Sequence, residues 1–310
     1  MGTTKKSKNQ KIIKKQVNKA IKRIPLGIVI CILIVGCIAG YLYYKKINDN
    51  KDSTNENNIK GNVAYLVQEG TTVDDVKITF LELFGTNGNP QIGDSVFIEC
   101  GDIDILIDAG EKASGSNTVV PFIEEHVSDN ILELVIVTHA DSDHLGGMVG
   151  LSNSYGALEV PGITYQYIVD FGYEGQTQLY KDYLEVRNKK IKEGTKYFSI
   201  GSIFDSDHLE AITRFYLGVD TYLDLLDYKT YEISEITDDN DRSVSCLLTH
   251  NDKKVLLCGD AEKKEEAYLT SLNIGHVDVF KANHHGSPTS NTNAFLDNIT
   301  PNYVIICSSE

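Results

Sequence analysis

The amino-acid sequence predicts an α/β domain preceded by one N-terminal transmembrane helix. Short apolar runs bounded by glycine and asparagine recur from residue 77 onward, with helical stretches between several of them, a pattern typical of layered α/β folds. An uncharged run covers residues 24–44, and several of the later apolar runs lead directly into aspartate or histidine. With 41% hydrophobic and 24% charged residues, the composition excludes a disordered or fibrous chain.

The N-terminal segment has the charge pattern of a membrane anchor. Residues 1–23 carry nine basic side chains and no acidic one, and the uncharged run Ile24–Tyr44 is 21 residues long. At about 1.5 Å per residue this run is long enough to cross a hydrocarbon core of about 30 Å. Because basic flanks stay in the cytoplasm, we expect a single-pass protein of the cell membrane with a cytoplasmic N-terminus and an extracellular domain. A cleaved signal peptide, or lipoprotein processing at Cys37, is the alternative.

The rest of the chain is strongly acidic. We expect a polar tether and lead-in over residues 45–76 and a folded domain over 77–310. The whole chain has 29 basic and 44 acidic residues, and removing the nine basic residues of the tail leaves 20 against 44, a net charge of −24. This charge disfavours a surface that binds long polyanions. Six cysteines in 310 residues are too few for a disulfide scaffold, and no protein partner can be inferred.

The predicted elements alternate along the domain. The expected strands are Lys77–Phe84, Ser95–Cys100, Ile103–Asp108, Leu132–Val137, Val244–Leu248, Val255–Cys258, Val277–Phe280 and Tyr303–Cys307. Helical patterns cover Asn117–His126, Gln176–Lys192 and Ala261–Leu272. We expect an aromatic-rich insertion over about 155–235, which includes Tyr165, Tyr167, Phe171 and Tyr173. These rings either pack as a core of their own or line a cleft.

Polar side chains follow four of the predicted strands. Asp108 ends one of them, Thr138–Gly147 follows the next, Gly259-Asp260 follows a third, and Lys281–Ser287 follows the fourth. Binding sites in α/β sheets form beyond the carboxyl ends of the strands. We therefore expect these carboxylates and imidazoles to meet at one edge.

The sharpest motif is His139-x-Asp141-x-Asp143-His144. Imidazole and carboxylate side chains are ligands for zinc, manganese or iron, and two such pairs suit two metal ions. Two neighbouring aspartates would repel each other without a cation between them. The motif therefore predicts a metal centre.

The order of these motifs resembles the metallo-β-lactamase superfamily of two-metal hydrolases. The order is Gly93-Asp94-Ser95-Val96, Asp108-Ala109-Gly110, the HADSDHLGG stretch, Gly259-Asp260 and Lys281-Ala282-Asn283-His284-His285-Gly286-Ser287. The aspartate at position 141, the K-x-x-H-H-G-S motif and Asn240-Asp241-Arg242-Ser243 are similar to the ComEC-like branch, named for a DNA-uptake protein. The resemblance covers about residues 77–307 and implies a metallo-β-lactamase-like αββα sandwich.

The resemblance also implies roles for single residues. His139 and Asp141 would hold one metal ion, Asp143 and His144 the other, and Asp260 would bridge both. His285 is the favoured remaining ligand and His284 the favoured catalytic acid, although the reverse assignment stays open. Asp108 would orient the ligand loop, and we count it with Asp143 and His284 among the catalytic residues. Two divalent cations are expected, zinc first and manganese as the alternative.

Two departures from the family pattern bear on these expectations. No histidine lies just before the Ser243 strand, where many relatives have a ligand; His208 would fill that position, or is a surface residue. The chain also stops at Glu310, where relatives usually continue, so a truncated product is a possible reading.

The function that follows is metal-dependent hydrolysis of a phosphodiester, in nucleic acid or in a phosphorylated wall polymer, by a water activated between two metals. One alternative is a non-catalytic binding or surface module on the same fold. Another is a lactam or lactone hydrolase, which is disfavoured because those branches usually keep a histidine where this chain has Asp141.

Overall fold

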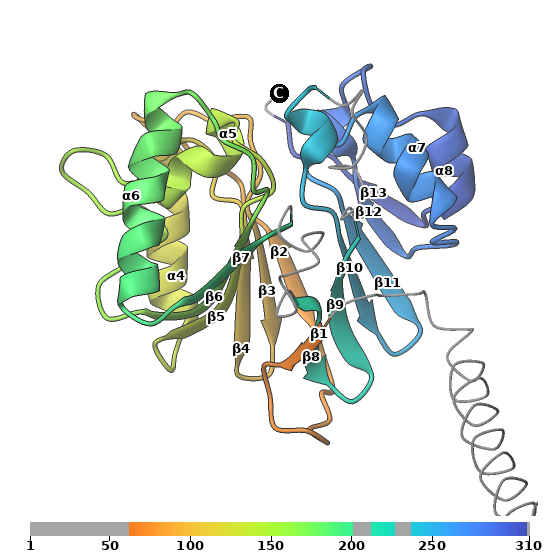
Figure 1. Ribbon diagram of the computed structural model, residues 1–310, viewed down its shortest axis with the longest axis horizontal. Helices are drawn as coiled ribbons and strands as arrows, with labels where there is room; N and C mark the ends of the chain where they lie inside the picture. The colour runs from red at the N-terminus through yellow and green to blue at the C-terminus, as the bar shows by residue number, and fades with distance from the viewer. Residues whose placement is uncertain (1–61, 201–211, 227–236, 309–310) are drawn as a thin grey trace, which may run out of the picture. The chain divides into compact units, whose positions relative to one another are not determined.

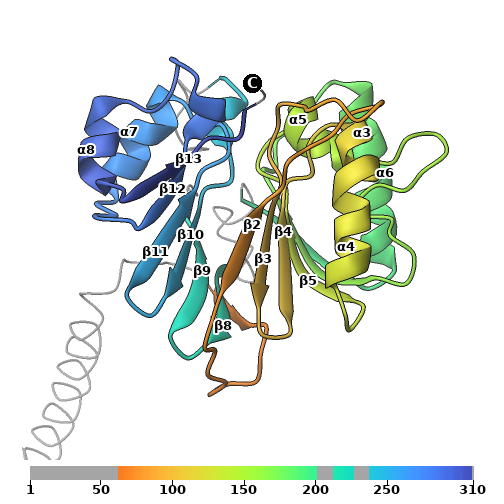
Figure 2. The same cartoon turned by 180° about the vertical axis from the view of Figure 1, so that it is seen from behind.

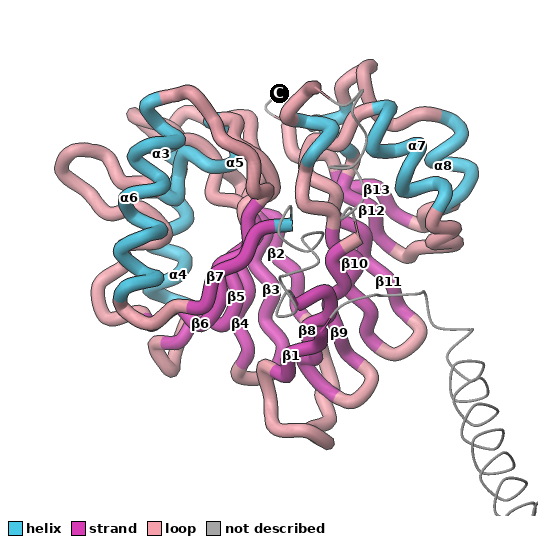
Figure 3. Tube along the Cα trace, viewed as in Figure 1, coloured by secondary structure: helices cyan, strands magenta, loops and turns pink. Residues whose placement is uncertain are grey.

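Two β-sheets pack face to face, and helices cover the outer face of each (Figure 1). The computed structural model describes residues 62–200, 212–226 and 237–308. Figure 3 shows the strands in the two central layers and the helices outside them. The predicted αββα arrangement is therefore confirmed for the described residues.

The first sheet has six strands in the order in which they occur along the chain: β2 (Lys77–Phe80), β3 (Val96–Cys100), β4 (Ile103–Ile107), β5 (Ile131–Ile136), β6 (Thr164–Asp170) and β7 (Lys196–Ser199). The pairs from β2 to β4 are antiparallel and those from β4 to β7 are parallel. The outer face carries α3 (Lys112–Ser114), α4 (Val120–His126), α5 (Ser142–Leu145) and α6 (Gln178–Lys192). Every residue of β4 is buried, as expected for a strand covered on both faces.

The second sheet has seven strands, ordered β1 (Asn62–Tyr65), β8 (Ile212–Gly218), β9 (Thr221–Leu225), β10 (Cys246–His250), β11 (Lys253–Leu257), β12 (Val279–Lys281) and β13 (Tyr303–Ile305). Its outer face carries α7 (Lys263–Ser271) and α8 (Asn293–Ile299). Strands β11, β12 and β13 run parallel. Parallel strands end at the same edge of a sheet, so the loops after β11 and β12 lie next to each other.

The core lies between the sheets. Phe215 of the second sheet contacts Tyr167 and Phe198 of the first, with ring centroids 5.5 Å and 6.2 Å apart. A smaller apolar cluster lies under α7 and α8, where Phe280 meets Phe295 at 5.6 Å. Folding thus buries apolar side chains on both faces of the second sheet.

The segment expected as an aromatic insertion contributes strands to both sheets. Its described residues form β6, α6 and β7 in one half and β8 and β9 in the other. Tyr165, Tyr167 and Phe171 are buried, so these three rings pack in the core. Tyr165 and Tyr167 also border a surface pocket beside Lys190 and Lys196.

Two predictions fall on residues that the structure does not describe. The run Ile24–Tyr44 and the side chain of His208 lie outside the described ranges. Among the residues that are described, no helix has both the length and the apolar character needed to cross a membrane.

A buried acidic pair makes the fold sensitive to pH. Asp104 on β4 and Glu133 on β5 are nearly inaccessible to solvent, and the backbone N–H of Asp104 donates to Glu133 Oε2 at 2.9 Å. Burial, together with neighbouring carboxylates, raises the pKa of each side chain to about 7. Because both pKa values rise on folding, the contribution of this pair to stability is fully present below about pH 4 and is lost as the pH rises through 7.

Glu133→Gln should remove much of this loss, because the amide oxygen keeps the hydrogen bond and carries no charge. We expect the variant to be more stable than the parent by roughly 2 kcal/mol at pH 8 and equally stable at pH 4. Urea unfolding across this pH range measures the difference, with Glu125→Gln on the exposed face of α4 as the control. A variant with the pH dependence of the parent would contradict this assignment.

Candidate metal centre

The four polar strand ends meet at one edge of the two sheets. Asp108 follows β4 and the His139–His144 loop follows β5, while Asp260 follows β11 and His284-His285 follow β12. This edge carries α5 and the C-terminal residues in both views of the fold (Figures 1 and 2). The centre is therefore assembled from both halves of the chain.

Asp108 fixes the loop that follows β5. Its carboxylate accepts hydrogen bonds from Thr138 N at 2.8 Å, from Thr138 Oγ1 at 2.6 Å and from His144 Nδ1 at 2.8 Å. With Nδ1 of His144 held in this way, Nε2 points to the opposite side, toward Asp260. Asp108 thus holds the ring of His144 through Nδ1.

Glycines let this loop lie directly on the backbone after β4. A Cβ atom at Gly147 would collide with the carbonyl oxygen of Ala109, and one at Gly146 would lie 2.8 Å from Lys112 N. Ala109 N in turn donates to His144 O at 2.9 Å. The two glycines are needed because backbone contacts backbone here.

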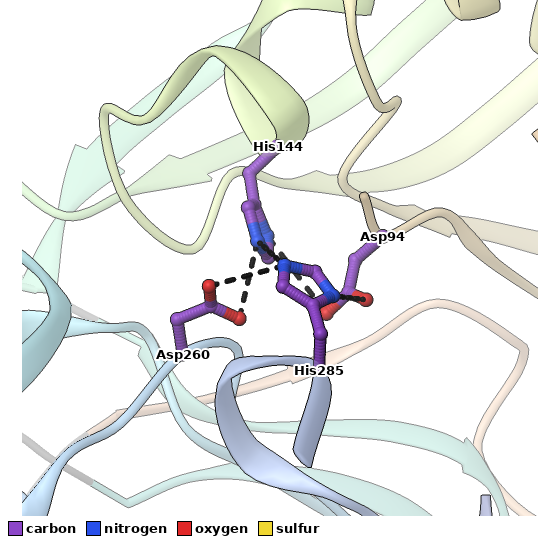
Figure 4. Close-up of side chains that lie close together, drawn as sticks. All are labelled: Asp94, His144, Asp260 and His285. Carbon is purple, nitrogen blue, oxygen red and sulfur yellow. Dashed lines mark hydrogen bonds and ion pairs between the residues drawn. The ribbon is translucent and has the colours of Figure 1, made fainter. Parts of the chain in front are cut away.

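Ring nitrogens and carboxylate oxygens converge on one point (Figure 4). His285 Nε2 lies 3.2 Å from Asp143 Oδ2, 3.2 Å from Asp260 Oδ2 and 3.3 Å from His144 Nε2. His144 Nε2 lies 3.2 Å from the other oxygen of Asp260. The side chains expected for one of the two metal positions are those of Asp143, His144, Asp260 and His285.

The C-terminal strand orients His285. Its Nδ1 contacts the carbonyl oxygen of Cys307 at 2.8 Å, just beyond β13. When Nδ1 donates to that carbonyl, Nε2 keeps its lone pair for a cation. The last described residues are thus part of the framework of the centre.

His139 and Asp141 form the second predicted ligand pair, next to Asp260. His139 is fully buried, and its Nε2 has no hydrogen-bond partner among the described residues. That nitrogen is 4.0 Å from Asp260 Oδ2 and 3.9 Å from Asp141 Oδ2. The Asp141 side chain is 54% exposed, so this position is the more open of the two. A buried nitrogen without a partner, flanked by two carboxylates, fits a cation ligand.

His284 faces solvent more than His285 does. Its Nδ1 contacts Glu262 Oε1 at 3.2 Å and its Nε2 lies 3.9 Å from Asp260 Oδ2. Both histidines have positive φ, 49° and 53°, a conformation that costs free energy for residues other than glycine.

A buried glutamate supports this strained turn. Glu266 accepts hydrogen bonds from the side chain of Asn283 and from the backbone N–H groups of Asn291 and Thr292. The side chain of Asn291 also makes two hydrogen bonds with the backbone of Asn283: its Oδ1 accepts from Asn283 N, and its Nδ2 donates to Asn283 O. The turn is therefore held from α7 and from the loop before α8.

Two residues of the centre were not among the predicted site residues. Asp94 groups with His144, Asp260 and His285, so that one possible ligand atom from each lies within 4.8 Å of the others. Lys281 is 1% exposed and pairs with Asp94 and Asp260. Both residues lie in sequence motifs described above. The signal that could have assigned them to the centre is a lysine at the end of a buried strand, because a buried lysine needs a negatively charged partner.

The electrostatics of the centre show an excess of negative charge. Burial alone would lower the pKa of His285, but its hydrogen bonds with Asp143 and Asp260 raise it to about 9. The same kind of contact holds the pKa of Asp143 at about 2, against the effect of burial. His139 lacks such a close carboxylate partner, so burial and the charge of His144 lower its pKa to about 3. Such a concentration of acids favours a divalent cation.

No family model matches the sequence. The sequence is 25% identical over 210 residues to "Recombination protein 2" of Haemophilus influenzae, covering 66% of this chain and 21% of that protein. It is also 25% identical over 220 residues to "Competence protein ComA" of Neisseria gonorrhoeae, covering 70% of this chain and 26% of that protein. The chain thus spans about a quarter of the length of these relatives.

Among solved structures, the chain is similar to the metallo-beta-lactamase fold protein YhfI from Bacillus subtilis. The identity is 12%, the TM-score is 0.44, and the match covers 74% of this chain and 85% of that one. Human tRNase Z, short form, matches with 11% identity and a TM-score of 0.38, over 74% of this chain and 92% of that one. The resemblance predicted from the motifs is confirmed by the sequence similarity to the two curated relatives, one of which is a competence protein.

Proposed function

We propose that the chain is a metal-dependent hydrolase of phosphodiesters. The observation that carries the proposal is that two ring nitrogens and two carboxylates meet at one point, with contacts of 3.2 or 3.3 Å between them. The nitrogens are His144 Nε2 and His285 Nε2, and the carboxylates are those of Asp143 and Asp260. Beside them lies the buried, unpartnered Nε2 of His139. Four side chains would hold one cation, and His139, Asp141 and Asp260 the second, with Asp260 shared. Zinc is the first choice because imidazole and carboxylate are its usual ligands, and manganese is the alternative.

The charge of the centre links substrate binding to the cations. A phosphodiester is an anion, and the carboxylates of Asp94, Asp108, Asp143 and Asp260 would repel it. Bound divalent cations would reverse this repulsion, and they would supply a hydroxide at neutral pH and stabilise the charge that develops on phosphorus. The protein itself contributes the fixed orientation of the ligands, through Asp108 and the carbonyl of Cys307.

His284 is the residue best placed to move a proton to the leaving group. It lies at the solvent side of the centre, and its contact with Glu262 Oε1 at 3.2 Å fixes the ring. With Nδ1 donating to Glu262, Nε2 faces the centre and can carry the proton that the leaving oxygen takes up. His285 has no such freedom, because both of its ring nitrogens are engaged inside the centre.

Both candidate substrates remain within the phosphodiester class. The names of the two curated relatives refer to recombination and competence, which supports nucleic acid. The acidic balance of residues 24–310 supports a short or single-stranded nucleic acid, or a wall polymer, over long duplex DNA, because gripping duplex DNA requires clustered basic residues.

Metal analysis of the full-length protein tests the centre. We expect roughly two zinc ions per chain, roughly one in Asp141→Asn, and loss of phosphodiesterase activity on chelation with recovery on adding zinc. Glu125→Gln, on the exposed face of α4, is the control and should behave as the parent. A folded parent that binds no metal would support the alternative of a non-catalytic module and end the hydrolase proposal.

The leaving group separates the roles of His284 and His285. His284→Gln should keep its metal and lose about 10²- to 10³-fold in kcat on a dinucleotide, whose alkoxide leaving group needs a proton. The loss should be small on bis(p-nitrophenyl) phosphate, whose leaving group needs none. His285→Gln should lose metal and be inactive on both.

Two results of this comparison would count against the assignments. The opposite behaviour of the two variants would reverse the roles of the histidines.

A phosphorylcholine ester and a lactone complete the substrate set, and turnover of the lactone alone would contradict phosphodiester hydrolysis.

We also propose that the protein is anchored in the cell membrane with the hydrolase domain outside the cell. The 21 uncharged residues Ile24–Tyr44 and the basic residues before them support this orientation. The protein should stay in the membrane fraction after carbonate washing, and protease added to intact cells with the wall removed should digest the domain. Release by carbonate, or protection from the protease, would contradict the anchor or its orientation.

A further inference from the structure

Lys281 places a positive charge inside the centre. It is the last residue of β12, its side chain is fully buried, and it contacts the carboxylate of Asp94, the carbonyl oxygen of Gly259 at 2.9 Å and Asp260 Oδ1 at 3.5 Å. An ammonium group has three donors, and these three acceptors account for them. A buried cation of this kind persists only with such partners.

Asp94 lies beneath the two inner histidines. One of its oxygens is 3.8 Å from His144 Nδ1 and the other is 3.5 Å from His285 Nδ1. Its backbone is fixed, because Asp94 N donates to Asp143 O at 3.1 Å and Gly110 N donates to Asp94 O at 2.9 Å. The carboxylate therefore faces the Nδ1 side of both rings, whereas Asp260 faces the Nε2 side (Figure 4).

Lys281 connects these two carboxylates. By contacting Oδ1 of Asp260, it leaves Oδ2 directed at His285, at 3.2 Å, and toward His139, at 4.0 Å. Its charge also offsets part of the negative charge that would attract cations, while Asp94 adds negative charge behind the rings. The two residues thus act on the centre with opposite signs.

We propose that Lys281 and Asp94 form an internal counter-ion pair that sets the affinity of the centre for divalent cations and orients the carboxylate of Asp260. The inference rests on the metal-binding function proposed above. Both residues are positioning residues, since they act through Asp260, His144 and His285. Removing the charge of Lys281 and removing that of Asp94 should shift metal affinity in opposite directions. Damage to the fold would instead weaken metal binding in both variants.

Four full-length proteins test the pair: the parent, Lys281→Met, Asp94→Asn and the double variant. Each is freed of metal, and its zinc affinity is measured by competition with a chromogenic chelator. We expect Lys281→Met to bind zinc about tenfold more tightly or better, because a positive charge a few ångströms away is removed. Asp94→Asn should bind about tenfold more weakly, and the double variant should return to within about threefold of the parent.

Thermal unfolding with and without zinc provides a second readout. Each single variant should melt below the parent without zinc, because one buried charge is left unpaired, and the double variant should lose less than the sum of the two. Zinc should raise the melting temperature of Lys281→Met more than that of the parent, because ligand stabilisation grows with affinity.

The outcomes separate this proposal from the proposed function. A parent that binds no zinc overturns the hydrolase function. A parent that binds zinc, with a Lys281→Met variant that binds it equally or more weakly, overturns only the counter-ion pair. A double variant as weak as Asp94→Asn makes Asp94 a direct ligand and also overturns the pair. If Lys281→Met alone does not fold, the double variant must fold and bind zinc as stated, and an unfolded double variant contradicts the pair.

Discussion

Repulsion among buried carboxylates is the constraint on which the rest of the centre depends. Asp94, Asp108 and Asp260 are almost inaccessible to solvent and lie around the rings of His144 and His285. Such a group is stable only if each charge has a partner. Asp108 is satisfied by three donors. Oδ2 of Asp94 pairs with Lys281, whereas its Oδ1 has no hydrogen-bond partner among the described residues. Oδ2 of Asp260 and Oδ2 of Asp143, which both face His285 Nε2, remain available for cations.

The backbone around the centre is shaped to bring these charges together. Gly147 allows the loop after β5 to lie on the backbone of Ala109, and the strained turn of His284 and His285 is held by Glu266. At Gly147 a side chain would collide with the backbone of Ala109. At His284 and His285, buried hydrogen bonds hold a left-handed backbone that residues other than glycine rarely adopt. Residues outside the centre thus add to the rigidity that Asp108 and the carbonyl of Cys307 give to the ligand rings.

The two halves of the sandwich depend on each other at this edge. One half supplies Asp94, Asp108 and the loop with His139, and the other supplies Asp260, Lys281 and His285. Contacts between the halves join residues more than a hundred positions apart, such as His144 and His285. The centre exists only when both sheets are formed and packed, so the proposed metal binding would be coupled to folding of the two halves.

The sequence by itself determined which residue types follow each strand and the order of the motifs, and the resemblance carried by that order implied the αββα class. It did not reveal β6 to β9, because these strands carry polar residues that mask their pattern; Arg214 and Asp224 form an ion pair inside the second sheet. Only the tertiary structure decided that Asp94 and Lys281 belong to the centre and which ring nitrogens face Asp260. These contacts join segments far apart in the chain, and the direction of a side chain follows from packing that no local pattern encodes.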